Sequence, residues 1–191
     1  MFRASVFTAA ALALCLGSAS AQAEATFNML DDMQRPARPM AQKAPVSDRQ
    51  IVAYATREAP GSIVVNTVER ALYLVLPDGQ AVRYGIGVAR PGMEWSGTLT
   101  IARKAEWPDW RPPAAMLLRR PDLPRFMKGG VDNPLGARAI YLGSSIYRIH
   151  GSNEPKSIGH AVSSGCIRMH NADVVDLYER VHVGARVVVL R

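Results

Sequence analysis

The sequence predicts a mainly β fold, a β-sandwich or partly closed barrel of mixed short strands with one or two short helices. Two observations predict it: short runs rich in Val, Ile, Leu and Tyr recur along the chain, and only two segments have a helical pattern. Many short strands with few helices are typical of sandwiches and barrels. The expected strands are 63–69, 71–76, 81–88, 99–103, 139–142, 146–150 and 186–190.

Turn residues connect several of these strands. Residues 77–80, Pro-Asp-Gly-Gln, form a turn signature between 71–76 and 81–88 and predict an antiparallel meander. Residues 143–145, Gly-Ser-Ser, predict a tight hairpin connection.

Two helices are expected, at 113–120 and at 172–181. The first has a proline near its first turn. The second follows Asn171, a good N-cap residue, and carries Asp173 near the positive end of the helix dipole. Its apolar residues recur at helical spacing and predict one buried side.

Residues 104–137 interrupt the strand pattern with prolines and glycines on both sides of the first helix. Long irregular segments in compact domains are often functional. Trp107 and Trp110 fit a lid or substrate wall, and they fit equally a structural cover over one end of the core. The sequence leaves both interpretations open.

Residues 1–23 have the pattern of a secretory signal peptide. Arg3 supplies the positive end, residues 6–16 supply the apolar run, and residues 21–23, Ala-Gln-Ala, supply a small-residue cleavage site. A bilayer span needs about 20 apolar residues, so an uncleaved anchor is the less favoured alternative. We expect export to a Gram-negative periplasm, in association with the cell wall.

Residues 24–61 contain several prolines and alanines without a sustained period, which predicts a tether or loosely packed arm. Residues 51–58 could instead form a short packed element. Residues 62–191 are then expected to form one catalytic domain, because about 130 residues suit a single core.

The formal charge of +7 falls to +6 when Arg3 is removed with the signal (7 − 1). A basic protein favours anionic partners without identifying one. The basic residues are scattered and form no run, so we expect no nucleic-acid partner.

The mature chain would keep one thiol, Cys166, because Cys15 lies in the signal. Lipidation at Cys15 is a minor alternative, since Leu14 stands where a small residue is required. A lone cysteine in an exported protein is an inert core residue, an intermolecular link or a reactive nucleophile. Its neighbours must decide.

Residues 149–151, Ile-His-Gly, and 163–169, Ser-Ser-Gly-Cys-Ile-Arg-Met, contain the ingredients of acyl transfer. A catalytic thiol needs a nearby imidazole or positive field, and His150 is expected at the end of a strand. Gly165 can adopt a backbone conformation closed to other residues. The N–H groups of Gly165 and Cys166 would then converge on a developing oxyanion.

These motifs, together with Asn171 and the upstream residues 133–136 and 140–142, resemble the L,D-transpeptidase catalytic domain, also called the YkuD domain. The resemblance covers about residues 63–191. It implies that Cys166 attacks the L,D bond of a peptidoglycan tetrapeptide stem, releases D-alanine and holds the stem as a thioester. The thioester is then passed to an acceptor, which in the family is an amine of a second stem, of an outer-membrane protein or of a D-amino acid, or else water.

By the same resemblance, His150 is the general base and the Gly151 carbonyl orients its ring. Many family members carry His where this chain has Ser164, so Ser164 is given a supporting role only. Arg168 binds a stem carboxylate or buttresses the cysteine loop, or it simply pairs with a surface acid. No metal site and no cofactor are expected, because the other histidines lack ligand spacing.

Two alternatives to the transpeptidase stay open. One keeps the fold and the thioester and uses water, which gives an L,D-carboxypeptidase or endopeptidase. The other is a catalytically silent cell-wall binding protein.

Overall fold

The computed structural model describes residues 49–191. The expected signal peptide 1–23 and most of the expected arm 24–61 lie outside the described residues. The elements are β1 Gln50–Ala53, β2 Ile63–Asn66, β3 Ala71–Val75, β4 Gln80–Gly85, β5 Val88–Ala89, β6 Gly97–Glu106, α2 Ala114–Arg119, β7 Arg138–Leu142, β8 Arg148–His150, η1 Pro155–Ser157, β9 Ala161–Ser163, β10 Ile167–Arg168, α3 Asn171–Arg180 and β11 Arg186–Leu190.

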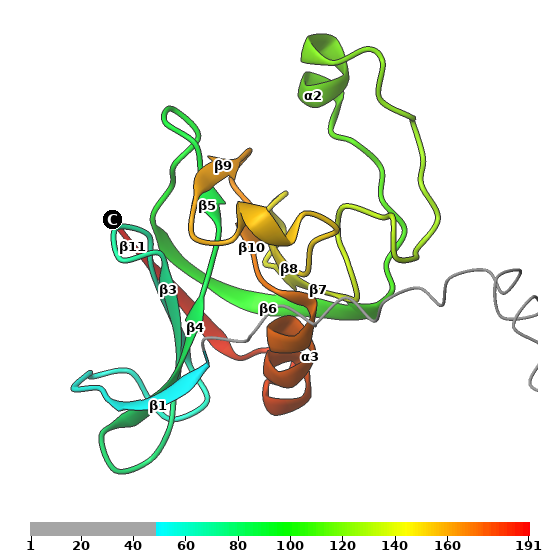
Figure 1. Cartoon of the computed structure of the whole chain (residues 1–191). Coiled ribbons are helices and arrows are strands. Elements are labelled where there is room, and N and C mark those ends of the chain that lie inside the picture. The colour runs from blue at the N-terminus through cyan, green and yellow to red at the C-terminus, as the bar shows by residue number, and fades with distance from the viewer. Residues whose placement is uncertain (1–48) are drawn as a thin grey trace, which may run out of the picture. The chain divides into compact units, whose positions relative to one another are not determined.

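The described strands form a mixed sheet in the order β1-β4-β3-β2-β11-β6-β7-β8-β10, with β5 and β9 as a separate parallel pair. β11 lies inside the sheet, parallel to β2 and antiparallel to β6. β6 pairs with β11 through its first half and with β7 through its second, across an irregularity between Ile101 and Arg103. Figure 1 shows β6 as a long curved strand. It therefore carries the sheet from one half of the domain to the other.

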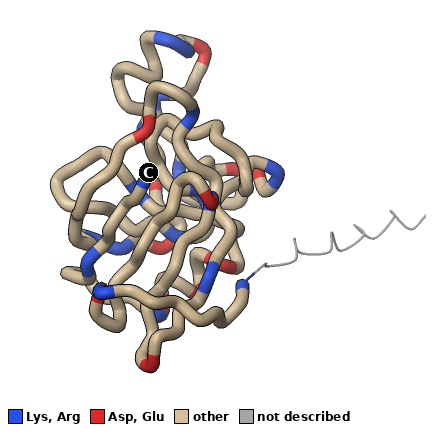
Figure 2. Tube along the Cα trace, turned by 90° about the vertical axis from the view of Figure 1, so that its left-hand side faces the viewer, with Lys and Arg blue, Asp and Glu red and all other residues tan. Residues whose placement is uncertain are grey.

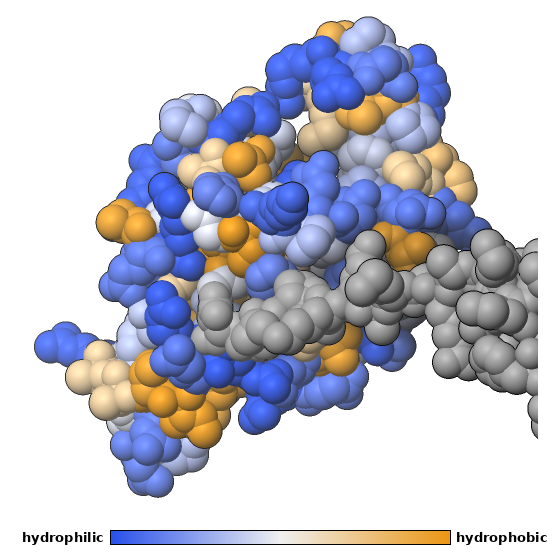
Figure 3. All heavy atoms as spheres, viewed as in Figure 1, coloured by the Kyte–Doolittle hydropathy of each residue, from blue (hydrophilic) through white to orange (hydrophobic). Residues whose placement is uncertain are grey.

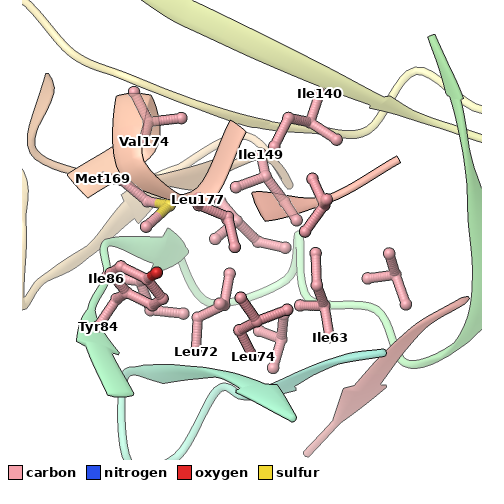
Figure 4. Close-up of a cluster of buried hydrophobic side chains, with 14 of the residues drawn as sticks. Ile63, Leu72, Leu74, Tyr84, Ile86, Ile140, Ile149, Met169, Val174 and Leu177 are labelled. Carbon is pink, nitrogen blue, oxygen red and sulfur yellow. The ribbon is translucent and has the colours of Figure 1, made fainter. Parts of the chain in front are cut away.

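One apolar core lies between the two halves of the sheet. Leu72 and Ile63 come from the β2–β4 half, Ile140 and Ile149 come from β7 and β8, and Leu177 comes from α3 (Figure 4). All five side chains are fully buried. Every second side chain of these strands points into this core, because side chains alternate between the two faces of a sheet. The mainly β architecture expected from the sequence is thus confirmed.

β1 adds an edge strand to the sheet by pairing antiparallel with β4. Beside it, the Tyr54 ring stacks on Tyr73 with ring centroids 4.3 Å apart. The last part of segment 24–61 therefore joins the sheet, which is the packed alternative that the sequence left open for residues 51–58.

The two predicted helices are present with small shifts in their ends. α2 agrees with the prediction at 113–120, and none of its residues is buried. The segment that carries α2 projects from the body, over a hollow in the surface seen in Figure 3. α3 agrees with the prediction at 172–181, but its N-cap is His170 and no side chain caps it. The prediction that Asn171 caps this helix is wrong, because its amide is used elsewhere.

The surface of the described domain is mixed in charge. Figure 2 shows Lys and Arg distributed along the trace with Asp and Glu between them. Apolar residues form small separate patches on the face drawn in Figure 3. Over residues 49–191, no helix has the length and apolar character needed to cross a membrane.

Candidate active site

Two neighbouring strands bring the predicted nucleophile and base to one cavity. β8 and β10 are parallel, with Ile149 beside Ile167, and both isoleucines point into the core. Because side chains alternate along a strand, the residues flanking them face the opposite side. Cys166 directly precedes β10 and His150 ends β8, and both line a cavity of about 230 Å³. We call this the cysteine cavity.

His150 is held by its own following residue. The ring Nδ1 lies 2.6 Å from the Gly151 carbonyl oxygen, and only 5% of the residue is exposed. A carbonyl accepts, so Nδ1 carries the proton and Nε2 keeps its lone pair. This is the contact that the sequence predicted for Gly151.

The electrostatic setting of His150 favours the neutral ring. Burial lowers its pKa to about 4, the Gly151 carbonyl opposes that shift, and the cations of Arg168 and Arg148 add to it. Near neutral pH the imidazole is therefore uncharged, with the Nε2 lone pair available.

Asn171 locks the backbone next to His150. Its Oδ1 accepts hydrogen bonds from the N–H groups of Ala137 at 3.0 Å and Ser152 at 3.2 Å, and its Nδ2 donates to the Ser152 carbonyl at 3.1 Å. A side chain at Gly151 would collide with Asn171 Oδ1. The family resemblance singled out Asn171, but sequence reasoning gave it only a capping role.

Ser163 organises the loop that presents the thiol. Its hydroxyl donates to the Cys166 carbonyl at 2.6 Å and accepts from the Gly165 N–H at 3.2 Å. The sequence predicted that this Gly165 N–H would point at an oxyanion, and in the structure it points at Ser163 instead. Within residues 49–191 the Cys166 N–H has no hydrogen-bond partner, so its role as an oxyanion donor stays a prediction.

An aromatic pair clamps Gly165. Trp95 and Tyr147 stack with centroids 4.2 Å apart and planes 6° apart, and Trp95 Nε1 donates to the Gly165 carbonyl at 2.8 Å. Gly165 has φ +113°, and a Cβ there would lie 2.7 Å from the Tyr147 ring. Only glycine fits this position without strain. Nothing in the local sequence pattern marks Trp95 or Tyr147 for this task.

Ser164 lines the cysteine cavity and is tied to a cation that the sequence analysis missed. Arg90 Nη1 donates to Ser164 Oγ at 3.1 Å, and the Arg90 N–H donates to the Ser163 carbonyl at 3.0 Å. The position where many relatives carry His thus holds a serine that contacts a guanidinium.

Arg168 also lines the cavity, and it is paired. Its Nη1 lies 2.7 Å from Glu154 Oε2, and its backbone exchanges hydrogen bonds with Gly87 at 2.8 and 2.9 Å. The expected pairing with an acid is therefore observed at the cavity wall, whereas a role in binding a stem carboxylate stays a prediction.

The segment 104–137 supplies one wall of the cysteine cavity. Trp110, Pro113, Met116 and Leu123 line it, with Trp110 only 8% exposed. Trp107 is 44% exposed and does not line the cavity. The two tryptophans therefore act separately, and the wall interpretation holds for Trp110 alone.

A larger cavity, of about 590 Å³, lies on the other side of the cysteine loop, where Trp95 and Gly165 line it. Neither Cys166 nor His150 does, so we place the chemistry in the smaller one. No cluster of three His, Cys, Asp or Glu that could hold a metal occurs in the described part of the chain.

A family model and curated relatives point to one family. The model of the YkuD L,D-transpeptidase catalytic domain matches residues 60–189. A probable L,D-transpeptidase ErfK/SrfK of Escherichia coli K12 is 41% identical over 135 residues, 67% of this chain and 43% of that protein. The matched segment thus spans less than half of that relative. A putative L,D-transpeptidase of Fuscovulum blasticum is 33% identical over 187 residues, 95% of this chain and 96% of that one.

Solved structures give the same fold. An L,D-transpeptidase from Mycobacterium smegmatis superposes with a TM-score of 0.56 at 18% identity, covering 70% of this chain and 59% of that one. A Brucella melitensis protein described as a probable carnitine operon oxidoreductase is 45% identical, with a TM-score of 0.51 over 74% of this chain and 92% of that one. By its family-model match and its relatives, the chain belongs to the L,D-transpeptidase catalytic domain (YkuD) family.

Proposed function

We propose that the protein is an exported peptidoglycan L,D-transpeptidase with Cys166 as nucleophile and His150 as general base. The observation that carries this is the pairing of β8 with β10, which sets a neutral imidazole and a free thiol in one cavity. Family membership supplies the substrate class: the relatives of this chain are described as L,D-transpeptidases. Residues 1–23 would direct export to the periplasm, and the part of segment 24–61 that precedes β1 would act as a tether for the domain.

In the first half-reaction, His150 Nε2 takes the proton from the Cys166 thiol. The sulfur attacks the carbonyl carbon of the L,D bond, and the resulting oxyanion is stabilised by the Cys166 N–H. As the C–N bond breaks, the imidazolium returns the proton to the departing amine of D-alanine. Burial lowers the pKa of His150, which makes the imidazolium more acidic and favours that return. The product is a stem thioester on Cys166.

In the second half-reaction, an acceptor amine attacks the thioester carbonyl. His150 removes a proton from the amine, the C–S bond breaks, and the thiolate recovers that proton from the imidazolium. A second stem as acceptor gives a 3-3 cross-link, an outer-membrane protein gives anchoring, a D-amino acid gives exchange, and water gives a carboxypeptidase. Which acceptor reacts depends on how far the cavity wall that includes Trp110 excludes water from the thioester.

The test is intact-mass analysis of the purified protein with disaccharide tetrapeptide, alone and with a second stem or an added D-amino acid. We expect a covalent stem adduct that lacks D-alanine, followed by cross-linked dimer or exchange product. Cys166→Ala should form no adduct, and His150→Gln should form it far more slowly. Tripeptide as the sole product would favour the water-using enzyme.

The silent binding protein is separated by labelling. A thiol reagent or a carbapenem, which acylates the cysteine of this family as a substrate mimic, should add to Cys166 and not to Cys166→Ala. A folded protein that binds stems but takes up neither label would contradict the enzyme.

A further inference from the structure

The strand register places the cation of Arg148 beside the nucleophile. Ile149 of β8 pairs with Ile167 of β10. One residue earlier on each chain segment, Arg148 therefore lies beside Cys166. Neighbouring strands run about 4.8 Å apart. Arg148 and Cys166 both line the cysteine cavity. The sequence analysis assigned Arg148 no role.

One donor of its guanidinium, Nε, lacks an acceptor in the part of the chain that the structure describes. Arg148 Nε is buried and has no hydrogen-bond partner within the described residues. Its recorded contact is with the Tyr141 ring, 5.3 Å from the guanidinium carbon. Arg168, the other arginine of this cavity, is by contrast paired with Glu154. Within residues 49–191 the charge of Arg148 has no ion-pair partner, and an anion in the cysteine cavity would supply one at its terminal Nη nitrogens.

We infer that Arg148 binds the free carboxylate of the D-amino acid that leaves in the first half-reaction. The inference rests on the proposed function and deepens it. In a donor stem whose L,D bond is the last peptide bond, this carboxylate is separated from the scissile carbonyl only by the nitrogen and α-carbon of the leaving residue. When that carbonyl meets Cys166, the carboxylate must therefore stay close by, where Arg148 lies.

The other carboxylates of a stem belong to residues on the far side of the scissile carbonyl or to side chains, and no such constraint holds them near Cys166. A planar guanidinium binds a carboxylate through two parallel hydrogen bonds, which adds geometric selectivity to charge. Arg148 would thus restrict donors to stems that end one residue after the cleaved bond. A longer or capped stem offers no carboxylate at this point.

Binding at Arg148 also bears on the base. The Arg148 charge is one of the causes that lower the pKa of His150. A carboxylate paired with Arg148 offsets that charge, so the imidazole becomes more basic when the donor is in place. The contact between Arg148 and the carboxylate would thus both recognise the leaving group and raise the pKa of His150.

The test compares two donors that differ only at their C-terminus, a tetrapeptide stem with a free carboxylate and the same stem with a terminal amide. Release of D-alanine or D-alaninamide is followed for the wild type, Arg148→Gln and Arg103→Gln. Wild type should favour the acid by about 10- to 100-fold in kcat/KM, as expected for a hydrogen-bonded charge pair. Arg148→Gln should lose that preference, mainly by slower use of the acid.

Arg103→Gln is the matched control. Arg103 stacks on the same Tyr141 ring, at 3.6 Å, but does not line the cavity, so this variant should keep the wild-type preference. Circular dichroism and thermal unfolding check that each variant is folded. Should Arg148→Gln unfold, Arg148→Met, which keeps the apolar packing of the side chain, provides the same comparison.

The outcomes separate the inference from the proposed function. If wild type releases D-alanine and Arg148→Gln keeps the preference for the acid, or if wild type shows no preference, the inference is overturned and the transpeptidase stands. If wild type releases product from neither donor, both are overturned.

Discussion

Asn171 should contribute more to stability than a surface asparagine with the same number of hydrogen bonds. Asn171→Ala removes the acceptor of the Ala137 and Ser152 N–H groups, which belong to residues only 5% and 4% exposed. It also removes the donor to the Ser152 carbonyl. Because each buried group left unsatisfied costs about 1–3 kcal/mol, we expect a loss of about 3 kcal/mol in the free energy of unfolding.

The assay is urea unfolding followed by tryptophan fluorescence, with Asn66→Ala as the control. Asn66 also makes three side-chain hydrogen bonds, to the N–H groups of Val68 and Glu69 and to the Glu69 carboxylate, all at the surface. Water replaces these bonds, so its loss should be about 1 kcal/mol or less. Asn171→Asp keeps an acceptor for both N–H groups and should fall between the two alanine variants.

The same change should slow the reaction. Asn171 packs against Gly151, whose carbonyl holds the His150 ring, so Asn171→Ala should lower the rate of Cys166 acylation by about tenfold even where the protein is fully folded. Equal destabilisation by Asn171→Ala and Asn66→Ala, with unchanged acylation, would refute the reasoning.

Three further predictions follow from the same geometry. The rate of acylation should persist down to about pH 5 and halve near pH 4, where His150 gains its proton; a midpoint near pH 6.5 would contradict the buried ring. The free energy of unfolding should also fall between pH 6.5 and pH 4, because the histidine of the unfolded chain binds its proton at the higher pH. Gly165→Ala should lower the melting temperature and abolish acylation of Cys166 by the stem, since its methyl meets Tyr147. Ser163→Ala, which frees the Cys166 carbonyl, should slow acylation several-fold in mass-spectrometric time courses while the helix content measured by circular dichroism stays unchanged.

The local elements of this fold could be predicted because their signals are local. Apolar alternation marked the strands, and the predicted helices at 113–120 and 172–181 correspond to Ala114–Arg119 and Asn171–Arg180. β6 was expected to end at residue 103 but continues to Glu106. It continues because β7 pairs alongside those last residues, and pairing between strands leaves no trace in the sequence of one of them.

The candidate site was predictable in its chemical groups and not in its supports. His150 and Cys166 lie in short sequence motifs whose residue types indicate acyl transfer. Trp95 and Arg90 contact the cysteine loop from the segment between β5 and β6, about 70 residues earlier in the sequence. Asn171 shows the limit most clearly: its position before a helix favours capping, yet the three backbone partners brought near it by the fold compete for the same amide and win.

The position of β11 has a consequence for the order in which the molecule is built. Residues 186–190 form the strand between β2 and β6, although they follow every other strand in the sequence of the described residues. β6 pairs with β7 on one side and with β11 on the other. Before β11 has folded, β6 therefore lacks its second neighbouring strand. A chain in which β11 has not yet paired should therefore not assemble Cys166 with His150, which would keep an immature protein from acylating itself or its surroundings.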